Sequence, residues 1–411
     1  GPATAFLQSG GASNAPYVFD DSAANIRAVT GSLILDHVSP YADSFAVSYQ
    51  RELNRSTGFE VRYLHTNGKD LFVQVQTNSR TVADSAMVIP TLYSLPTAAA
   101  LGALPTIGTV AAGDPVLKGA TQAPRQLPQF AGVLTSDPPV GKSRYDGVSF
   151  SVNRRLSRHF AGTAAYTWSR TWDNSFNELF TSSLNPRRSQ DAGEFFGQGL
   201  DLSADWSRSI VDIPNRFVAS GIYEVPFKSH NAFLNALVGG WELTGIFQAQ
   251  SGQLVDIQSG IDSNRNGDNA GDRAILNPNG DRNVGTQVVG LTLVNGVVTQ
   301  VPVGSAPNVN VRAYLAVNPN AGWVQTGYFA KELANGGAGT APRNDYRTKS
   351  WNNTDMVFLK NTRFGGEGRF NFQFGAEVHD VFNQRPRTIA GVGSGARSFT
   401  LPDTQQFLDY S

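Results

Sequence analysis

The stretch that decides the fold is "HFAGTAAYTWSRTWDNS", residues 159–175. Large or apolar residues alternate in it with small and hydroxylated ones. Phe160, Tyr166 and Trp168 fall on one side of an extended chain, together with a glycine and an alanine, and the other side is threonine, serine and alanine. A period of two predicts a β-strand whose two faces meet different surroundings. The question is which solvent each face meets.

Similar alternating segments recur along the chain in four pairs. Within a pair the connection is short, whereas the connections between pairs are very long. The predicted pairs lie near 43–66, 146–171, 215–251 and 353–382, and the long connections span 78–143, 172–214 and 252–352. Ordinary connections have about 4 to 6 residues. Long loops confined to one end are typical of outer-membrane barrels, which have short periplasmic turns and long extracellular loops. Residues 230–240, "HNAFLNALVGG", predict a short helix within the third pair.

The composition narrows the class of protein. Charged residues make up 16% of the 411 residues, against about 25% in typical soluble domains. The formal net charge is +0, which gives a nucleic-acid partner no electrostatic support. There is no cysteine, and no run of about 18 apolar residues that would predict a transmembrane helix. The first residues lack the features of a signal peptide, so we expect a processed chain or a fragment.

The fourth pair raises the question of the two faces most sharply. Phe370, Phe372 and Phe374 share one face. The opposite face carries Asn371, Gln373, Glu377 and His379. In a soluble sandwich the phenylalanine row would be the core, whereas in a membrane barrel it would face lipid and the polar row would line a wet lumen. Periodicity alone does not separate these two readings.

Aromatic residues near strand ends favour lipid. Tyrosine and tryptophan are stable at the boundary between water and hydrocarbon, where they form two girdles around a barrel. The predicted interfacial aromatics are Tyr166, Trp168, Trp172, Tyr223 and Trp241. We therefore predict an all-β protein, a transmembrane antiparallel β-barrel of the bacterial outer membrane. Outer-membrane lipid is then a partner, the phenylalanine row is lipid-facing, and the polar row is lumen-facing.

The sharpest local motif is "IDSNRNGDNAGDR", residues 261–273. It fits the first half of a calcium loop, in which oxygen ligands alternate and a glycine permits the sharp turn. The candidate metal ligands are Asp262, Asn264, Asn266, Asp268 and Asp272. The acidic residue expected at the twelfth position is replaced by Arg273. The alternative is a loop whose side chains cap their own turns.

Arrangements typical of enzymes are missing from the sequence. The five histidines are widely separated, and the glycine-rich stretches do not follow a strand and open a helix, as a phosphate-binding loop requires. We therefore predict no catalytic residues and no cofactor other than the calcium candidate.

Six segments, taken in order, resemble a known family. They are "YDGVSFSVNRRLSRHFAGTAAYTWSRTWDNS", "DIPNRFVASGIYEVPF", "LVGGWELTGIFQAQSGQLVDI", the Asn/Asp/Gly loop followed by "DRAILNP", "WNNTDMVFLKNTRF" and "GRFNFQFGAEVHDVFNQRP". In this order they resemble the C-terminal half of Oar-like TonB-dependent outer-membrane proteins. The resemblance covers about residues 40 to 390.

The resemblance implies a barrel of about 22 strands, an N-terminal plug, and coupling to the TonB system through an N-terminal box. The plug and the box have no counterpart in this sequence, so we expect the chain to be part of such a barrel. The implied function is ligand capture and transport across the outer membrane. Two alternatives stay open. The first is a structural or adhesive surface protein that displays its long loops, and its partners would include other surface proteins. The second is a soluble extracellular calcium-binding β protein.

Overall fold

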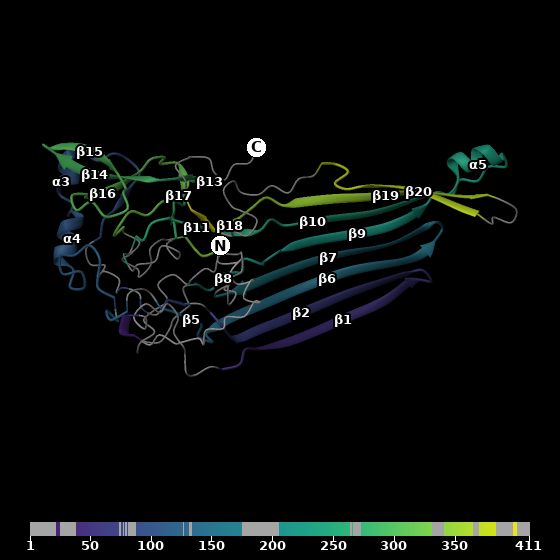
Figure 1. Ribbon diagram of the computed structural model, residues 1–411, viewed down its shortest axis with the longest axis horizontal. Helices are drawn as coiled ribbons and strands as arrows, with labels where there is room; N and C mark the ends of the chain where they lie inside the picture. Colours follow the sequence, from purple (N-terminus) through teal and green to yellow (C-terminus); the bar gives the residue numbers. More distant parts are fainter. Residues whose placement is uncertain are drawn as a thin grey trace, which may run out of the picture.

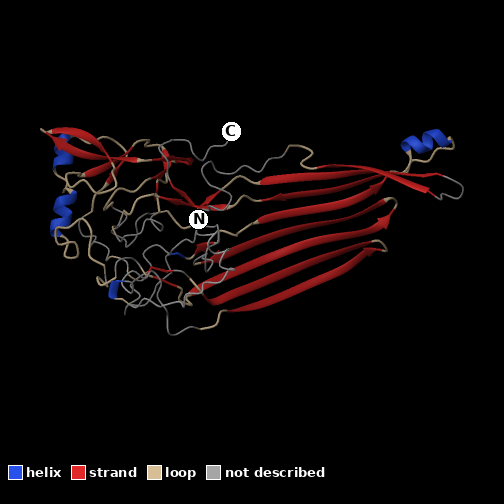
Figure 2. Cartoon of the chain, in the orientation of Figure 1, coloured by secondary structure: helices blue, strands red, loops and turns tan. Residues whose placement is uncertain are grey.

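The computed structural model describes residues 22–24, 38–73, 75–76, 78, 80, 88–125, 127–130, 134–174, 205–263, 265, 273–330, 341–364, 370–383 and 398–400. A large antiparallel sheet of long strands forms one part of the molecule, and an assembly of small sheets and short helices lies at the other end (Figure 1). The sheet consists of long strands, whereas the assembly contains short strands and short helices joined by loops (Figure 2). No helix in the described ranges is long and apolar enough to cross a membrane.

The large sheet follows the chain as a simple meander. Its strands are β1 (Tyr41–Asn54), β2 (Thr57–Leu71), β6 (Gly141–Ser157), β7 (Phe160–Asp173), β9 (Asn215–Glu224), β10 (Trp241–Gln250), β19 (Trp351–Phe364) and β20 (Phe370–Val378). They pair antiparallel in that order, and the short β8 (Ser207–Arg208) adds to β7. Each pair of strands overlies one of the predicted pairs. The sheet is open over the described residues, with β1 and β20 at its edges.

Tight turns join β1 to β2 and β6 to β7 at the end opposite the loops, which we call the turn side. Between β6 and β7, Arg158 and His159 have φ values of 51° and 67°. Positive φ at both central residues is the geometry of a two-residue turn that matches the twist of its strands. Between β9 and β10 the chain forms helix α5 (Ala232–Val238), as the sequence predicts.

The register sets which side chains share a face, because directly paired residues point the same way. Val152 pairs with Ala164, Ala164 with Ala219, and Ala219 with Phe247. Followed across all eight strands, this rule defines one face, which we call the apolar face. Polar side chains such as Arg154 and Lys360 also lie on it. Its large apolar members include Val47, Tyr49, Phe59, Val61, Tyr63, Val148, Phe150, Val152, Phe160, Tyr166, Trp168, Phe217, Tyr223, Trp241, Leu243, Phe247, Met356, Phe358, Phe370, Phe372 and Phe374.

The opposite face, which we call the polar face, is rich in hydroxyl, amide and charged groups. One row across the sheet contains Glu60, Ser151, Gln248 and Asn353, with Ala165 and Val218 at its middle. Thr163 and Ser220 form a neighbouring pair whose hydroxyl oxygens lie 3.0 Å apart. Isoleucines interrupt this face, among them Ile246, which pairs with Ser220. The two faces therefore differ in polarity along the full width of the sheet.

At the other end, the loop side, the long connections fold into a compact loop assembly. Its elements are β3 (Val75–Gln76), β4 (Thr91–Leu92), α3 (Ala98–Gly102), α4 (Ile107–Gly113), β5 (Thr135–Ser136), β11 (Leu254–Gln258), β12 (Ile275–Leu276), β13 (Asp281–Thr286), β14 (Val288–Val294), β15 (Val297–Pro302), β16 (Ala313–Ala316), β17 (Ala321–Val324), β18 (Tyr346–Arg347) and β21 (Ser398–Thr400). The predicted loops at 78–143 and 252–352 are therefore not plain loops.

The first and third long loops share one hydrophobic core. Ile89 and Ile107, from the first loop, are fully buried together with Val288, Tyr314 and Phe329 from the third. Strand β4 also pairs in parallel with β16. Burial of apolar area is the dominant favourable term in folding, so the two loops stabilise each other as one unit.

Candidate functional site

Two surfaces qualify as functional: the wall formed by the large sheet, and the loop assembly at its mouth. On the wall, Phe370, Phe372 and Phe374 are 56%, 59% and 58% exposed. The described parts of the chain thus leave this row uncovered. A row of exposed aromatic side chains in water is costly, at about 25 cal/mol per Å². The contact of these three phenylalanines with lipid stays a prediction.

The predicted lumen-facing residues lie on the polar face. Asn371, Gln373 and Glu377 alternate with the phenylalanines on β20. His379 follows the strand, with Nε2 3.4 Å from Glu377 Oε1 and Nδ1 3.8 Å from Asp355 Oδ1. These charged groups form a small polar cluster on the side away from the phenylalanines. Their role as lumen-lining residues stays a prediction.

The predicted interfacial aromatics occur at two levels of the apolar face. Trp168 and Trp172 lie toward the loop side, and Tyr223 and Trp241 lie at the turn side. Tyr166 lies between these levels, and its hydroxyl donates to Asn215 Oδ1 at 2.7 Å. Two levels of amphipathic rings match the girdles expected of a membrane barrel, although this role is itself a prediction.

A polar cluster marks the loop-side edge of the apolar face, and the sequence analysis missed it. The Asp146 carboxylate accepts hydrogen bonds from Tyr63 at 2.9 Å and from Arg144 Nε at 2.7 Å, and it lies 2.7 Å from His65 Nδ1. Nearby, Arg170 lies over the Trp168 ring at 5.6 Å. Charged groups beside aromatic rings at this level suit a headgroup region.

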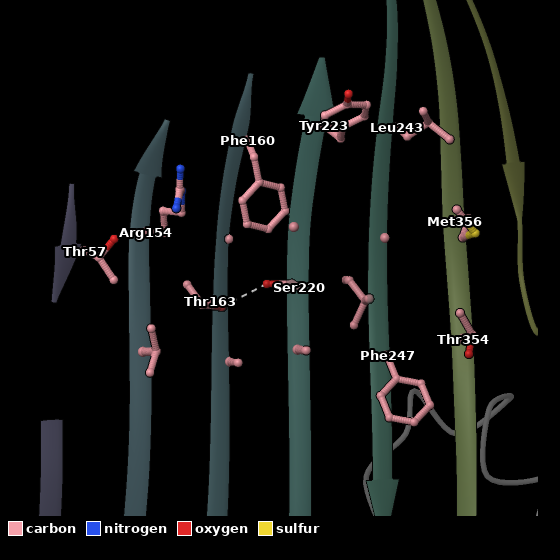
Figure 3. A pocket seen from close by; sticks show the side chains of 17 residues that line it. Thr57, Arg154, Phe160, Thr163, Ser220, Tyr223, Leu243, Phe247, Thr354 and Met356 are labelled. Carbon is pink, nitrogen blue, oxygen red and sulfur yellow. Dashed lines mark hydrogen bonds between the residues drawn. The ribbon is translucent and has the colours of Figure 1, made fainter. Parts of the chain in front are cut away.

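A shallow apolar groove of about 600 Å³ crosses the turn-side half of the wall (Figure 3). Gly162, Gly221 and Gly245 leave room at its base, and Phe160 and Tyr223 stand at its rim. The ring of Phe160 lies over Gly162, where a Cβ would be 2.9 Å from the ring. An aromatic ring covering a strand glycine protects the backbone there. The groove is part of the apolar face.

Buried ion pairs join the loop assembly to the end of the large sheet. We call this set the latch: Asp173, Asp205, Asp212, Arg208, Arg273, Arg343 and Arg347. Arg343 pairs with Asp173 at the end of β7, and its Nε donates to Asp205 O at 2.9 Å. Arg273 pairs with the Asp205 side chain. Asp205, in the second long connection, thus contacts two arginines of the third.

Asp212 is the second centre of the latch. Its carboxylate is fully buried and accepts hydrogen bonds from Arg347 at 2.5 Å and Arg208 at 2.6 Å. The same carboxylate accepts from the Thr171 amide at 2.7 Å, which ties it to β7. Burial lowers the pKa of Arg347, and the neighbouring Asp212 counteracts that shift. Asp212 therefore connects the third loop directly to the strand.

The structure describes only part of the candidate calcium loop, residues 261–273. Of its five predicted ligands, Asp262 is described, whereas Asn264, Asn266, Asp268 and Asp272 lie outside the described residues. In the described part of the chain, no three acidic or histidine side chains form a metal-binding group. Arg273, at the twelfth position of the motif, belongs to the latch. Calcium binding stays a prediction.

An open meander of long antiparallel strands, with one apolar and one polar face, is the architecture expected of the wall of an outer-membrane barrel. The family model of the outer membrane beta barrel domain matches residues 2–388. The chain belongs to that family, and its location is the bacterial outer membrane. This result confirms the predicted fold class and removes the soluble alternative.

Other known proteins add little beyond the family. No curated protein sequence matches the chain. The outer membrane transporter YddB from Escherichia coli is a solved structure similar to it, with 8% identity and a TM-score of 0.36. The match covers 86% of this chain and 31% of that transporter, so the chain spans about a third of its length.

Proposed function

We propose that the chain forms part of the wall and the outer mouth of a TonB-dependent transporter of the Oar-like type. In this reading the apolar face meets lipid, the polar face lines the lumen, and the loop assembly captures the ligand outside the cell. The energy for passage comes from the TonB system, which acts through an N-terminal region of the full protein.

The observation that carries the proposal is the latch. Loops that serve only as connections need no buried ion pairs to hold them over the end of the sheet. Here Arg343 and Arg347 bring the third loop against β7 and β8, and the first loop follows because it shares the same core. Binding residues on loops held by a rigid scaffold are a common arrangement. The loop assembly is thus an ordered surface at the mouth of the barrel.

Uptake by cells tests this function. Cells that express the full protein, cells that lack it, and expressing cells without TonB are grown in one complex medium. Mass spectrometry then compares the small molecules and peptides depleted from each medium. We expect at least one compound to be taken up only when both the protein and TonB are present. Depletion that does not depend on TonB would contradict the proposal.

A second candidate is display of the loop assembly as an adhesive surface. The β14–β15 hairpin supports it, because Val294 and Val297 beside its turn are 51% and 63% exposed. Asn295 and Gly296 form that turn with φ values of 52° and 77°. Display predicts that removing residues 288–302 reduces binding of the cells to other surfaces, while TonB makes no difference to that binding.

A further inference from the structure

Helix α5 carries the most exposed large apolar side chain of the described chain. Phe233 is 75% exposed, Leu237 is 58% exposed and Leu234 is 45% exposed. The helix has seven residues and projects beyond the ends of the strands at the turn side (Figure 1). Isolated helices this short are not stable in water, so its surroundings decide whether it persists.

The polar groups of the α5 segment are used locally, which leaves the apolar ones for a partner. Asn231 caps the helix, and its Oδ1 accepts from the amides of Phe233 at 2.9 Å and Leu234 at 3.2 Å. Asn235 Oδ1 accepts from the Ser229 amide at 3.2 Å. The spacing of positions 233, 234 and 237 places their side chains on one side of the helix, away from Asn235.

Two side chains of the wall hold the C-terminal end of α5 on the apolar face. Trp241 Nε1 donates to Leu237 O at 3.2 Å. The Lys360 ammonium donates to Gly239 O. Trp241 and Lys360 are directly paired in the sheet, and Lys360 in turn pairs with Phe374, so both belong to the apolar face.

The link between helix and strand leaves little freedom. Gly240 has a φ of 68°, and a Cβ there would lie 2.2 Å from Asn361 O. Only glycine fits such a position. Helix α5 is therefore held on the same side of the wall as the apolar groove and as Tyr223.

We propose that α5 is an interfacial anchor that inserts Phe233, Leu234 and Leu237 into the phospholipid leaflet at the turn side of the barrel. This inference rests on the proposed function for one point, that the apolar face meets lipid. Lipid is the expected occupant because the apolar surface of α5 extends the apolar face past the level of Tyr223 and Trp241. Interfacial helices bury such a face at the boundary of headgroups and acyl chains.

Charge complementarity agrees with a lipid surface. The segment leading into α5 carries Lys228 and His230, both exposed, and no acidic residue lies between Pro226 and Gly240. Lysine near a bilayer surface is attracted to anionic phospholipids by about 1 kcal/mol. A periplasmic protein partner is the other possible occupant, and the experiment below separates it from lipid.

Site-specific quenching tests the anchor. The chain contains no cysteine, so Phe233→Cys, Leu237→Cys and Ala236→Cys each introduce a single labelling position into it. Each variant of the full protein is labelled with an environment-sensitive fluorophore and inserted into phosphatidylethanolamine and phosphatidylglycerol vesicles. Quenching is measured with lipids spin-labelled near the headgroup, with lipids spin-labelled deep in the acyl chain, and with aqueous iodide.

We expect the labels at 233 and 237 to lose about half of their emission to the shallow spin label and little to iodide, as the depth of interfacial helices requires. The label at 236 lies on another side of the helix, so iodide should quench it more strongly than the labels at 233 and 237. Two control variants define the limits of the scale. The label at Phe150→Cys, on the wall, should be quenched by the deep spin label, and the label at Val297→Cys, in the loop assembly, should be quenched by iodide.

Iodide quenching at 233 and 237 as strong as at 297 would overturn the anchor. Shielding from both iodide and lipid would also overturn it, in favour of a protein contact. If the label at 150 is not quenched by lipid either, the membrane-facing wall itself is wrong. Uptake of a ligand is measured separately, so failure of transport and failure of the anchor are distinguishable.

Discussion

Arg343, in the third long loop, and Asp173, at the loop-side end of β7, form an ion pair whose side chains are 7% and 6% exposed. Charges this deeply buried are costly unless each has its partner. The pair therefore couples the position of the loop assembly to the end of a membrane-spanning strand. Arg343 and Asp173 are 170 residues apart in the sequence.

The first prediction concerns this pair. Arg343→Ala leaves the Asp173 carboxylate buried without its cation, which costs about 3–5 kcal/mol. We expect the loop assembly to open more often, while the large sheet stays folded. Limited proteolysis measures this as faster cleavage within 273–330, with unchanged heat-dependent gel migration of the barrel.

Two controls sharpen this test. The double variant Arg343→Met with Asp173→Leu removes both charges and should recover most of the protection. Lys69→Ala breaks an exposed pair with Asp43, with side chains 49% and 64% exposed, and should leave cleavage unchanged, because exposed pairs contribute about 0–1 kcal/mol. Equal cleavage in the wild type and in Arg343→Ala would contradict the role of the latch.

The second prediction tests the two faces of the wall. Val152 lies on the apolar face midway between the two aromatic levels, and its neighbour Ser151 lies on the polar face. Val152→Arg should reduce the free energy of unfolding in phospholipid vesicles by about 2–4 kcal/mol, the cost of arginine at the bilayer midplane. Ser151→Arg is the matched control, and guanidinium titration of both variants is the measurement. Equal costs at 151 and 152 would refute the assignment of the faces.

The third prediction concerns pH. Tyr314 is almost fully buried in the loop assembly, and its hydroxyl donates to Tyr328 O at 2.9 Å. Burial raises the pKa of Tyr314 above its ordinary value of about 10. The unfolded chain therefore loses this proton first as pH rises, so the stability contributed by neutral Tyr314 is present below about pH 10 and is lost above it.

Urea titrations at about pH 8 and about pH 11 measure this effect. The wild type should lose more stability between these two values than Tyr314→Phe does. At the lower pH the variant should be less stable by about 1 kcal/mol, the net value of one hydrogen bond. An identical pH dependence of the two proteins would show that Tyr314 does not titrate in this way.

The fourth prediction concerns the 262–273 motif. If its oxygen groups hold calcium, terbium luminescence should saturate with the purified protein and be displaced by calcium. Asp262→Asn should weaken that binding about tenfold or more, because the charge of the ligands tunes affinity. Asp281→Asn, which removes an acidic side chain outside the motif, is the control. If the wild type gives no saturable terbium signal, the motif does not bind calcium, and its side chains cap the turns of the loop instead.

Most of the wall was predictable from the sequence. The alternation around Tyr166 and Trp168, and around Phe370, Phe372 and Phe374, indicates strands because successive side chains of a strand point to opposite faces. The short helix between β9 and β10 was also predictable, because Asn231 can cap its start and two glycines follow its end. What the pattern left open was the medium on each face, since an apolar row suits both a soluble core and a lipid surface. The family match decided that question.

The loop assembly was not predictable in the same way. Its buried residues, such as Ile89 and Tyr314, stand in short apolar runs of the sequence, "AMVIP" and "AYLAV", without a period that indicates a face. The latch shows the same difficulty, because Asp173 ends β7, Asp205 lies in the second long connection and Arg343 lies in the third. Aspartate and arginine in loops are usually solvated, and only their burial shows that they are paired.

By itself, the sequence determined the two-faced strands, their order in pairs and the side on which the long connections lie. These features depend on the alternation of neighbouring residues, which acts over a few positions of the chain. Only the tertiary structure decided which loops share a core, which charges are buried together and where α5 is held. Those relationships depend on register between strands and on contacts between segments more than a hundred residues apart, and no local pattern specifies either.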